Sequence, residues 1–153
     1  MLNWSKNPIS VNAWIGKPSY GKMHIPSCDF SSMISPGQFE EFVLPVIQNE
    51  VKRMTHNIFH LDGKGVAEHL DYLLAIPEIN AFQWVQGAGE TYPIMQWLPL
   101  IKKNQAAGKS VMVILQANEH DGFIKAMDPQ GLLLYIIAEP EIQTDIIKRV
   151  GKW

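Results

Sequence analysis

Nearly continuous apolar runs alternate with longer segments whose apolar residues recur at helical spacing, and this alternation constrains the fold most. The runs occupy residues 57–62, 81–85, 111–116 and 132–138. Such runs, each followed by a helical pattern, are typical of a parallel sheet that helices cover. The sequence therefore predicts an α/β fold. Two architectures have this same pattern: part of a (β/α)8 TIM barrel, and a doubly wound sheet of about five strands.

The remaining elements follow from local signals. A further strand is expected at 24–30, and helices at 66–74, 93–107, 119–127 and 140–150. The first helix should begin at Ser35, with Pro36 in its first turn and Gln38 at the capping-box position. Pro45 should kink or split this helix. Its apolar residues are expected on one stripe that faces the core: Phe39, Phe42, Val43, Val46, Ile47, Val51 and Met54. Residues 1–23 are predicted to be an irregular arm with a short strand at 11–15, and residues 24–153 one domain.

The stretch from Asn57 to Gly63 is predicted to be a buried strand that ends in a tight turn. Because strand side chains alternate, His60 and Asp62 should project from the same face near its carboxyl end. Barrel enzymes keep their chemistry at that end, so both are candidate catalytic residues. The alternative is a buried histidine bonded to backbone, with Asp62 capping the next helix.

Other candidates are expected at neighbouring strand ends. Asp29 should follow the strand at 24–30, where it could orient a substrate, bond His60 or simply form a turn. We count Gln83, Trp84, Gln116 and Glu119 as candidate substrate-binding residues, although ordinary loop polarity explains the polar ones nearly as well. The segment 86–90 could cradle a phosphate, but a turn is the simpler interpretation.

Composition excludes several functional classes. The chain of 153 residues is 46% hydrophobic, 18% charged and has net charge −2, which indicates a globular protein without the basic character of nucleic-acid binders. No leader or membrane-spanning run is apparent, so we expect a cytoplasmic protein with no membrane partner. Cys28 is the single cysteine, which excludes an internal disulfide. His56, His69 and His120 have no partner at ligand spacing, and we expect them to be solvated.

At 60–63 (His-Leu-Asp-Gly) and 83–89 (Gln-Trp-Val-Gln-Gly-Ala-Gly), the sequence resembles the uroporphyrinogen decarboxylase superfamily. The resemblance is closer to its uncharacterised and corrinoid-methyltransferase-like branch. The segment 28–45 is similar to a strand and helix of that family, so the resemblance spans about 24–153. It implies a partial TIM barrel, the carboxyl-terminal half of a longer (β/α)8 fold.

The resemblance also implies a reaction class. The decarboxylases' amino-terminal strands, which carry their arginines and an aspartate, have no counterpart here, so methyl transfer is favoured over decarboxylation. In the methyltransferase branch, a His-x-Cys pair and a later cysteine hold zinc. His60 matches that histidine, but Asp62 stands in place of the cysteine. Zinc at His60 and Asp62, with a corrinoid protein as partner, is the implied cofactor arrangement.

Two functional hypotheses remain open. The first is an enzyme or enzyme fragment that acts on a small-molecule substrate through His60, Asp62 and Asp29. The second is a non-catalytic half-barrel. Because the edges of a half-barrel expose unpaired strands and apolar surface, we expect a homo-oligomer or a partner that supplies the missing strands.

Overall fold

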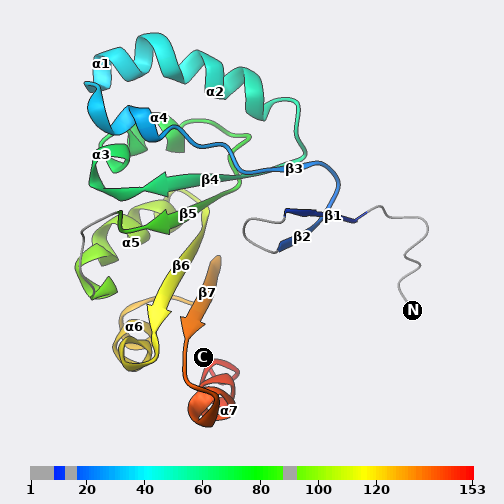
Figure 1. The fold of residues 1–153 in the computed structure, drawn as a ribbon, viewed down its shortest axis with the longest axis vertical. Helices are drawn as coiled ribbons and strands as arrows, with labels where there is room; N and C mark the ends of the chain where they lie inside the picture. The colour runs from blue at the N-terminus through cyan, green and yellow to red at the C-terminus, as the bar shows by residue number, and fades with distance from the viewer. Residues whose placement is uncertain (1–8, 13–16, 88–92) are drawn as a thin grey trace.

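The main sheet consists of five parallel strands. The structure, a computed structural model, describes residues 9–12, 17–87 and 93–153 (Figure 1). Each strand of the sheet pairs in parallel with the next one in the chain. Their order is β3 (Met23–His24), β4 (His56–Asp62), β5 (Ala81–Val85), β6 (Ser110–Gln116) and β7 (Leu132–Ile137). The predicted α/β fold with a parallel sheet is confirmed.

The strand order places the helices on one side of the sheet. A doubly wound sheet reverses its strand order at a switch point, whereas this order never reverses. Because crossovers between parallel strands are right-handed, successive crossovers in one direction put their helices on the same face. Figure 1 shows the strands following one another from β3 to β7, with α1 and α2 beyond β4 and α7 beyond β7.

The helices agree closely with the predicted ranges, although several are divided. The segment expected at 66–74 consists of two short helices, and 3₁₀ turns precede the helices that begin near residues 98 and 120. No helix within the described ranges has the length and apolar character needed to cross a membrane. The helices are α1 (Pro36–Gln38), α2 (Leu44–Val51), α3 (Gly63–Ala67), α4 (Leu70–Leu74), α5 (Leu98–Ala106), α6 (His120–Ala126) and α7 (Pro140–Val150), with 3₁₀ turns η1 (Asp29–Met33), η3 (Ile94–Trp97) and η4 (Ala117–Glu119).

The first helix contains a π-helical turn, η2 (Phe39–Val43), between α1 and α2. The capping box of Ser35 and Gln38 forms as predicted. Pro45 then lies in the first turn of α2, directly after the π turn, at a position where proline is tolerated. The wider π turn shifts the register, so Phe42 and Val46 are 62% and 63% exposed. The prediction that both belong to the buried stripe was therefore wrong.

The two faces of the sheet have different surroundings. We call the side that packs on the helices the covered face and the opposite side the open face. Fully buried apolar side chains of β4, β5 and β6 fill the covered face and join helical residues in one cluster. Burying one such side chain contributes about 1.5–3 kcal/mol. The strand members of this cluster are Phe59, Leu61, Phe82, Trp84, Val111, Val113 and Leu115.

The amino-terminal region is more regular than predicted. Strands β1 (Ile9–Asn12) and β2 (Lys17–Tyr20) pair antiparallel, and residues 13–15 of the expected strand lie outside the described residues. Ser19 Oγ lies 2.9 Å from His56 Nδ1, which ties β2 to the start of β4. The strand expected at 24–30 is only Met23–His24, because Pro26 has no N–H to donate to a ladder.

Candidate functional site

His60 and Gln83 form the centre of the candidate site on the open face. The residues lie opposite each other on β4 and β5, and their side chains are 9% and 7% exposed. His60 Nδ1 lies 3.1 Å from Gln83 Oε1. With the amide in this orientation, Nδ1–H donates to Gln83, and the lone pair of the ring resides on Nε2. That tautomer can accept a proton or bind an electrophile through Nε2.

Asp62 lies on the same open face, two residues nearer the carboxyl end of β4. Both the strand and this placement were predicted. Asp62 is the N-cap residue of α3, yet its side chain makes no capping hydrogen bond. The alternative of a structural cap is therefore not realised, and the half-buried Asp62 shares the open face with the His60–Gln83 pair.

Two glycines bring the ends of β4 and β5 together. Gly63 and Gly87 have φ of 76° and 88°, which side-chain-bearing residues rarely adopt. A Cβ atom on Gly87 would lie 3.0 Å from the Gly63 Cα and 3.8 Å from Asp62 Oδ1. The close approach of these two backbones fixes the edge of the site. Residues 88–90 of the suggested phosphate cradle lie outside the described residues.

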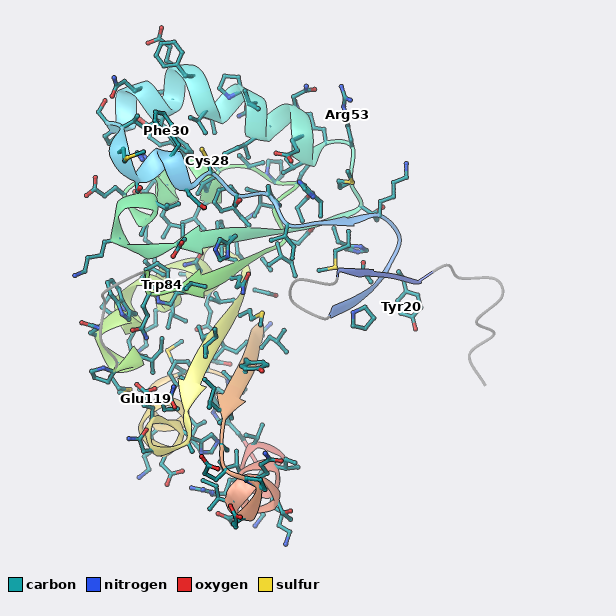
Figure 2. All side chains as sticks on the ribbon, viewed as in Figure 1. Tyr20, Cys28, Phe30, Arg53, Trp84 and Glu119 are labelled. Atoms are coloured by element: carbon teal, nitrogen blue, oxygen red, sulfur yellow. The ribbon has the colours of Figure 1, made fainter. Side chains whose placement is uncertain are left out.

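Trp84 does not belong to the open face, so its predicted role in substrate binding was wrong. Neighbouring residues of a strand point to opposite sides, and Gln83 occupies the open one. Trp84 is 1% exposed and packs against Trp97, with ring centroids 4.8 Å apart. Figure 2 shows it on the side of β5 that faces α5.

The carboxylate of Glu119 accepts hydrogen bonds from two backbone N–H groups. One carboxylate oxygen accepts the N–H of Ile94, and the other accepts the N–H of Gln116 at 2.9 Å. The side chain is 9% exposed and lies at η4, beside the end of β6 (Figure 2). These bonds explain its burial as capping of two 3₁₀ turns rather than as contact with a substrate.

Asp29 and Gln116 are the remaining predicted site residues. Asp29 was expected at a strand end, but it is the exposed first residue of η1, and its carbonyl accepts the Ser32 hydroxyl at 2.7 Å. The expectation of a strand end there was wrong. Gln116 is half-buried on the open face of β6, where it lies opposite Ile137 of β7. It borders a groove of about 370 Å³ with Asn118 and Ile142.

The histidines expected to be solvated are largely buried, so that prediction was wrong. His69 and His120 are fully buried and His56 is half-buried. His69 stacks on Phe39 with ring centroids 4.2 Å apart and lies 2.8 Å from the Ser31 carbonyl oxygen. These contacts give His69 a structural role.

A polar cluster that sequence reasoning missed joins α6 to α7. His120 Nδ1 lies 3.0 Å from Asp121 Oδ1, and Arg149 donates to the same oxygen. The hydrogen bond from His120 and the nearby Arg149 guanidinium lower the pKa of the Asp121 carboxyl below its usual value. The adjacent His120 and Asp121 were a local signal, but Arg149 is distant in sequence.

The described residues do not fit a catalytic zinc ion. Such a site takes three protein ligands and an open position. Among the ranges that the structure describes, no three His, Cys, Asp or Glu side chains gather closely enough to hold a metal. Cys28 is half-buried in the segment before η1. His60 and Asp62 would therefore leave the ion one protein ligand short.

The chain matches no protein-family model, no curated protein and no solved structure. The resemblance to the uroporphyrinogen decarboxylase superfamily therefore stays a prediction.

Proposed function

We propose that this chain is a half-barrel related to the (β/α)8 fold and binds a small polar substrate on the open face, at the carboxyl ends of β4 and β5. The observation that carries the proposal is the bond between His60 and Gln83, which orients a nearly buried imidazole beside Asp62. A histidine near the carboxyl end of a parallel strand lies where barrel enzymes keep their catalytic residues.

In this arrangement, His60 is the acid–base residue. Gln83 holds its Nδ1–H, so Nε2 accepts or returns the proton of the substrate. Asp62 orients a hydrogen-bond donor of the substrate or stabilises the protonated imidazole. The reaction class suggested by the resemblance is methyl transfer or a related one-carbon reaction. Because the donor set of the described residues does not fit zinc, no step of this proposal passes through a metal ion.

Methyl transfer from methylcobalamin to a thiol acceptor tests the proposal directly. We expect His60→Ala and His60→Asn to reduce the rate by about 10²–10⁴-fold, the usual contribution of a general acid–base group. His56→Ala is the matched control, because His56 lies on the same strand but bonds Ser19 at the far end. A wild-type chain without transfer activity would exclude this reaction. Equal losses in the two histidine positions would exclude the assigned role of His60.

A second candidate function is a non-catalytic half-barrel that assembles with another chain. It is favoured by the exposed apolar residues of β7, where Leu133, Tyr135 and Ile137 are 38%, 55% and 46% exposed. Binding of small carboxylic acids and amines, measured by chemical-shift changes of the His60 ring, separates the two functions. Saturable shifts that Gln83→Leu abolishes support a site, and their absence supports the assembly role.

A further inference from the structure

Exposed apolar side chains gather at the two ends of the sheet. Apart from Tyr20, every large apolar side chain that is exposed within the described ranges lies at one of these ends. Patches of this kind mark interaction sites, because folded proteins rarely leave them in water. Figure 1 shows these ends as the α1–α2 region and the β7–α7 region. Their members are Phe30, Met33, Phe42 and Val46 at the first, and Leu133, Tyr135, Ile137, Ile142 and Ile147 at the second.

The outer edge of β7 is suited to strand addition. Within the described residues β7 pairs only with β6. Because the Val111 N–H donates to the Gly131 carbonyl, the backbone groups of Leu132, Leu134 and Ile136 point away from β6. Exposed edges are usually protected by charged residues or proline, and Leu132–Ile137 contains neither. This edge therefore presents the outward-pointing backbone N–H and C=O groups of three residues on an apolar strand.

An apolar groove adjoins the edge. It has a volume of about 790 Å³ and lies between β7 and α7, lined by Leu134, Ile136, Ile146 and Trp153 among others. Helix α7 buries only Ile146, while Ile147 is 70% exposed. The helix thus has an apolar side that its own sheet does not cover.

The charges of α7 favour a copy of itself in antiparallel orientation. The first half of the helix region carries Glu139, Glu141 and Asp145, whereas its end carries Lys148, Arg149 and Lys152. A two-fold axis would bring the acidic half of one helix against the basic end of the other. Asp145 and Arg149 also pair within the helix at 3.1 Å, and Arg149 bonds Asp121, so the exposed Glu141 and Lys148 carry most of this complementarity.

We propose that the β7–α7 edge binds the same edge of a second copy of this chain about a two-fold axis. The two β7 strands pair antiparallel, and the outward backbone groups fix the register. Leu134 then lies opposite Leu134 of the second copy, and Leu132 lies opposite Ile136. The strand pairing itself buries no charged side chain, because Leu132–Ile137 contains none.

The same charges disfavour the alternative arrangement, in which the β7–α7 end meets an α1–α2 end and a barrel closes. Neighbouring helices of a parallel sheet run in the same direction. The α1–α2 region also has acids first, at Glu40 and Glu41, and bases last, at Lys52 and Arg53. Beside α7 it would set acid against acid and base against base. The proposed dimer stands whether or not the site on the open face is catalytic.

Cysteine cross-linking tests the register. In the Cys28→Ser background, Leu134→Cys places two thiols on the axis, where paired Cα atoms about 5.5 Å apart allow a disulfide. Mild oxidation should convert most of the protein to a covalent dimer, while Gln130→Cys, in an exposed turn outside the pairing, should remain monomeric on a reducing-agent-free gel. A dimer in solution that does not cross-link at position 134 would overturn the register.

Sedimentation measurements test the surface. The wild type should have twice the mass of its 17.3 kDa chain at micromolar concentrations. Tyr135→Lys should raise the dimer dissociation constant at least tenfold, and the matched variant Phe42→Lys should leave it unchanged. Circular dichroism checks that both variants are folded. A monomeric wild type, or a dimer weakened equally by both variants, would overturn the proposal, and should Tyr135→Lys fail to fold, the cross-link decides.

Discussion

The two ends of the open face have opposite characters. At β4 and β5 the side chains are polar and nearly buried, and His60 and Gln83 bond each other. At β7 they are apolar, and Tyr135 is 55% exposed. Buried polar groups are tolerated when they satisfy each other, whereas exposed apolar groups indicate a surface that another molecule covers. One sheet therefore presents a candidate ligand site at one end and the proposed assembly surface at the other.

Paired truncations should separate the two ends most strongly. Leu61→Ala removes a fully buried side chain from the covered face of β4 and should lower the free energy of unfolding by about 2–5 kcal/mol. Leu133→Ala, on the exposed end, should cost under about 1 kcal/mol in the monomer. Urea titration, at a protein concentration below the dissociation constant of the proposed dimer, measures the free energy of unfolding of both variants. Equal costs would show that the β7 end is packed as tightly as β4.

Glycine substitutions should give the next largest effect. Gly87→Ala puts a Cβ 3.0 Å from the Gly63 Cα at φ 88°, which should cost about 1–3 kcal/mol. Gly37→Ala is the matched control, because a Cβ there meets nothing within 4 Å in helix α1, and it should gain about 0.5–1 kcal/mol. Thermal unfolding of both variants checks the signs. A neutral Gly87→Ala would mean that the β4 and β5 ends separate freely.

The smallest effect concerns the cluster that fixes α7 beside the assembly surface. Because the folded-state pKa of Asp121 is lowered, its ionised form favours the folded protein above the unfolded value near 4. That contribution is lost as the pH falls from about 4 through the folded value.

Asp121→Asn should therefore lower the urea midpoint slightly at pH 6 and have less effect at pH 3. Asp145→Asn serves as the control, since it leaves the His120 bond in place. A difference between wild type and Asp121→Asn that stays constant with pH would contradict the assigned cause.

The predictions succeeded where local chemistry decides the outcome. The capping box at Ser35 and the strand through His60 depend on neighbouring residues, and both form. The exposed Phe42 was missed because a π turn ahead of Pro45 changes the helical register. The error at Trp84 was avoidable, since strand alternation already separates it from Gln83.

Other parts of the site depend on contacts that sequence spacing does not specify. The bond from His60 to Gln83 requires the β4–β5 register, which sets residues 23 apart opposite each other. The burial of His120 depends on packing of α6 that no local pattern reveals, and Asp121 meets an arginine 28 residues away. Glu119 was predicted to bind substrate because the sequence does not show that its carboxylate accepts hydrogen bonds from the backbone. The donors are the N–H groups of Ile94 and Gln116.

The sequential strand order also bears on how the chain acquires its structure during synthesis. Each strand of the main sheet finds its neighbour in the strand translated just before it, so no pairing must wait for a distant segment. Successive strands can therefore join the sheet one after another as the polypeptide leaves the ribosome. Among the strands of this sheet β7 is synthesised last, so its outer edge becomes available for association only after the other four strands have been made.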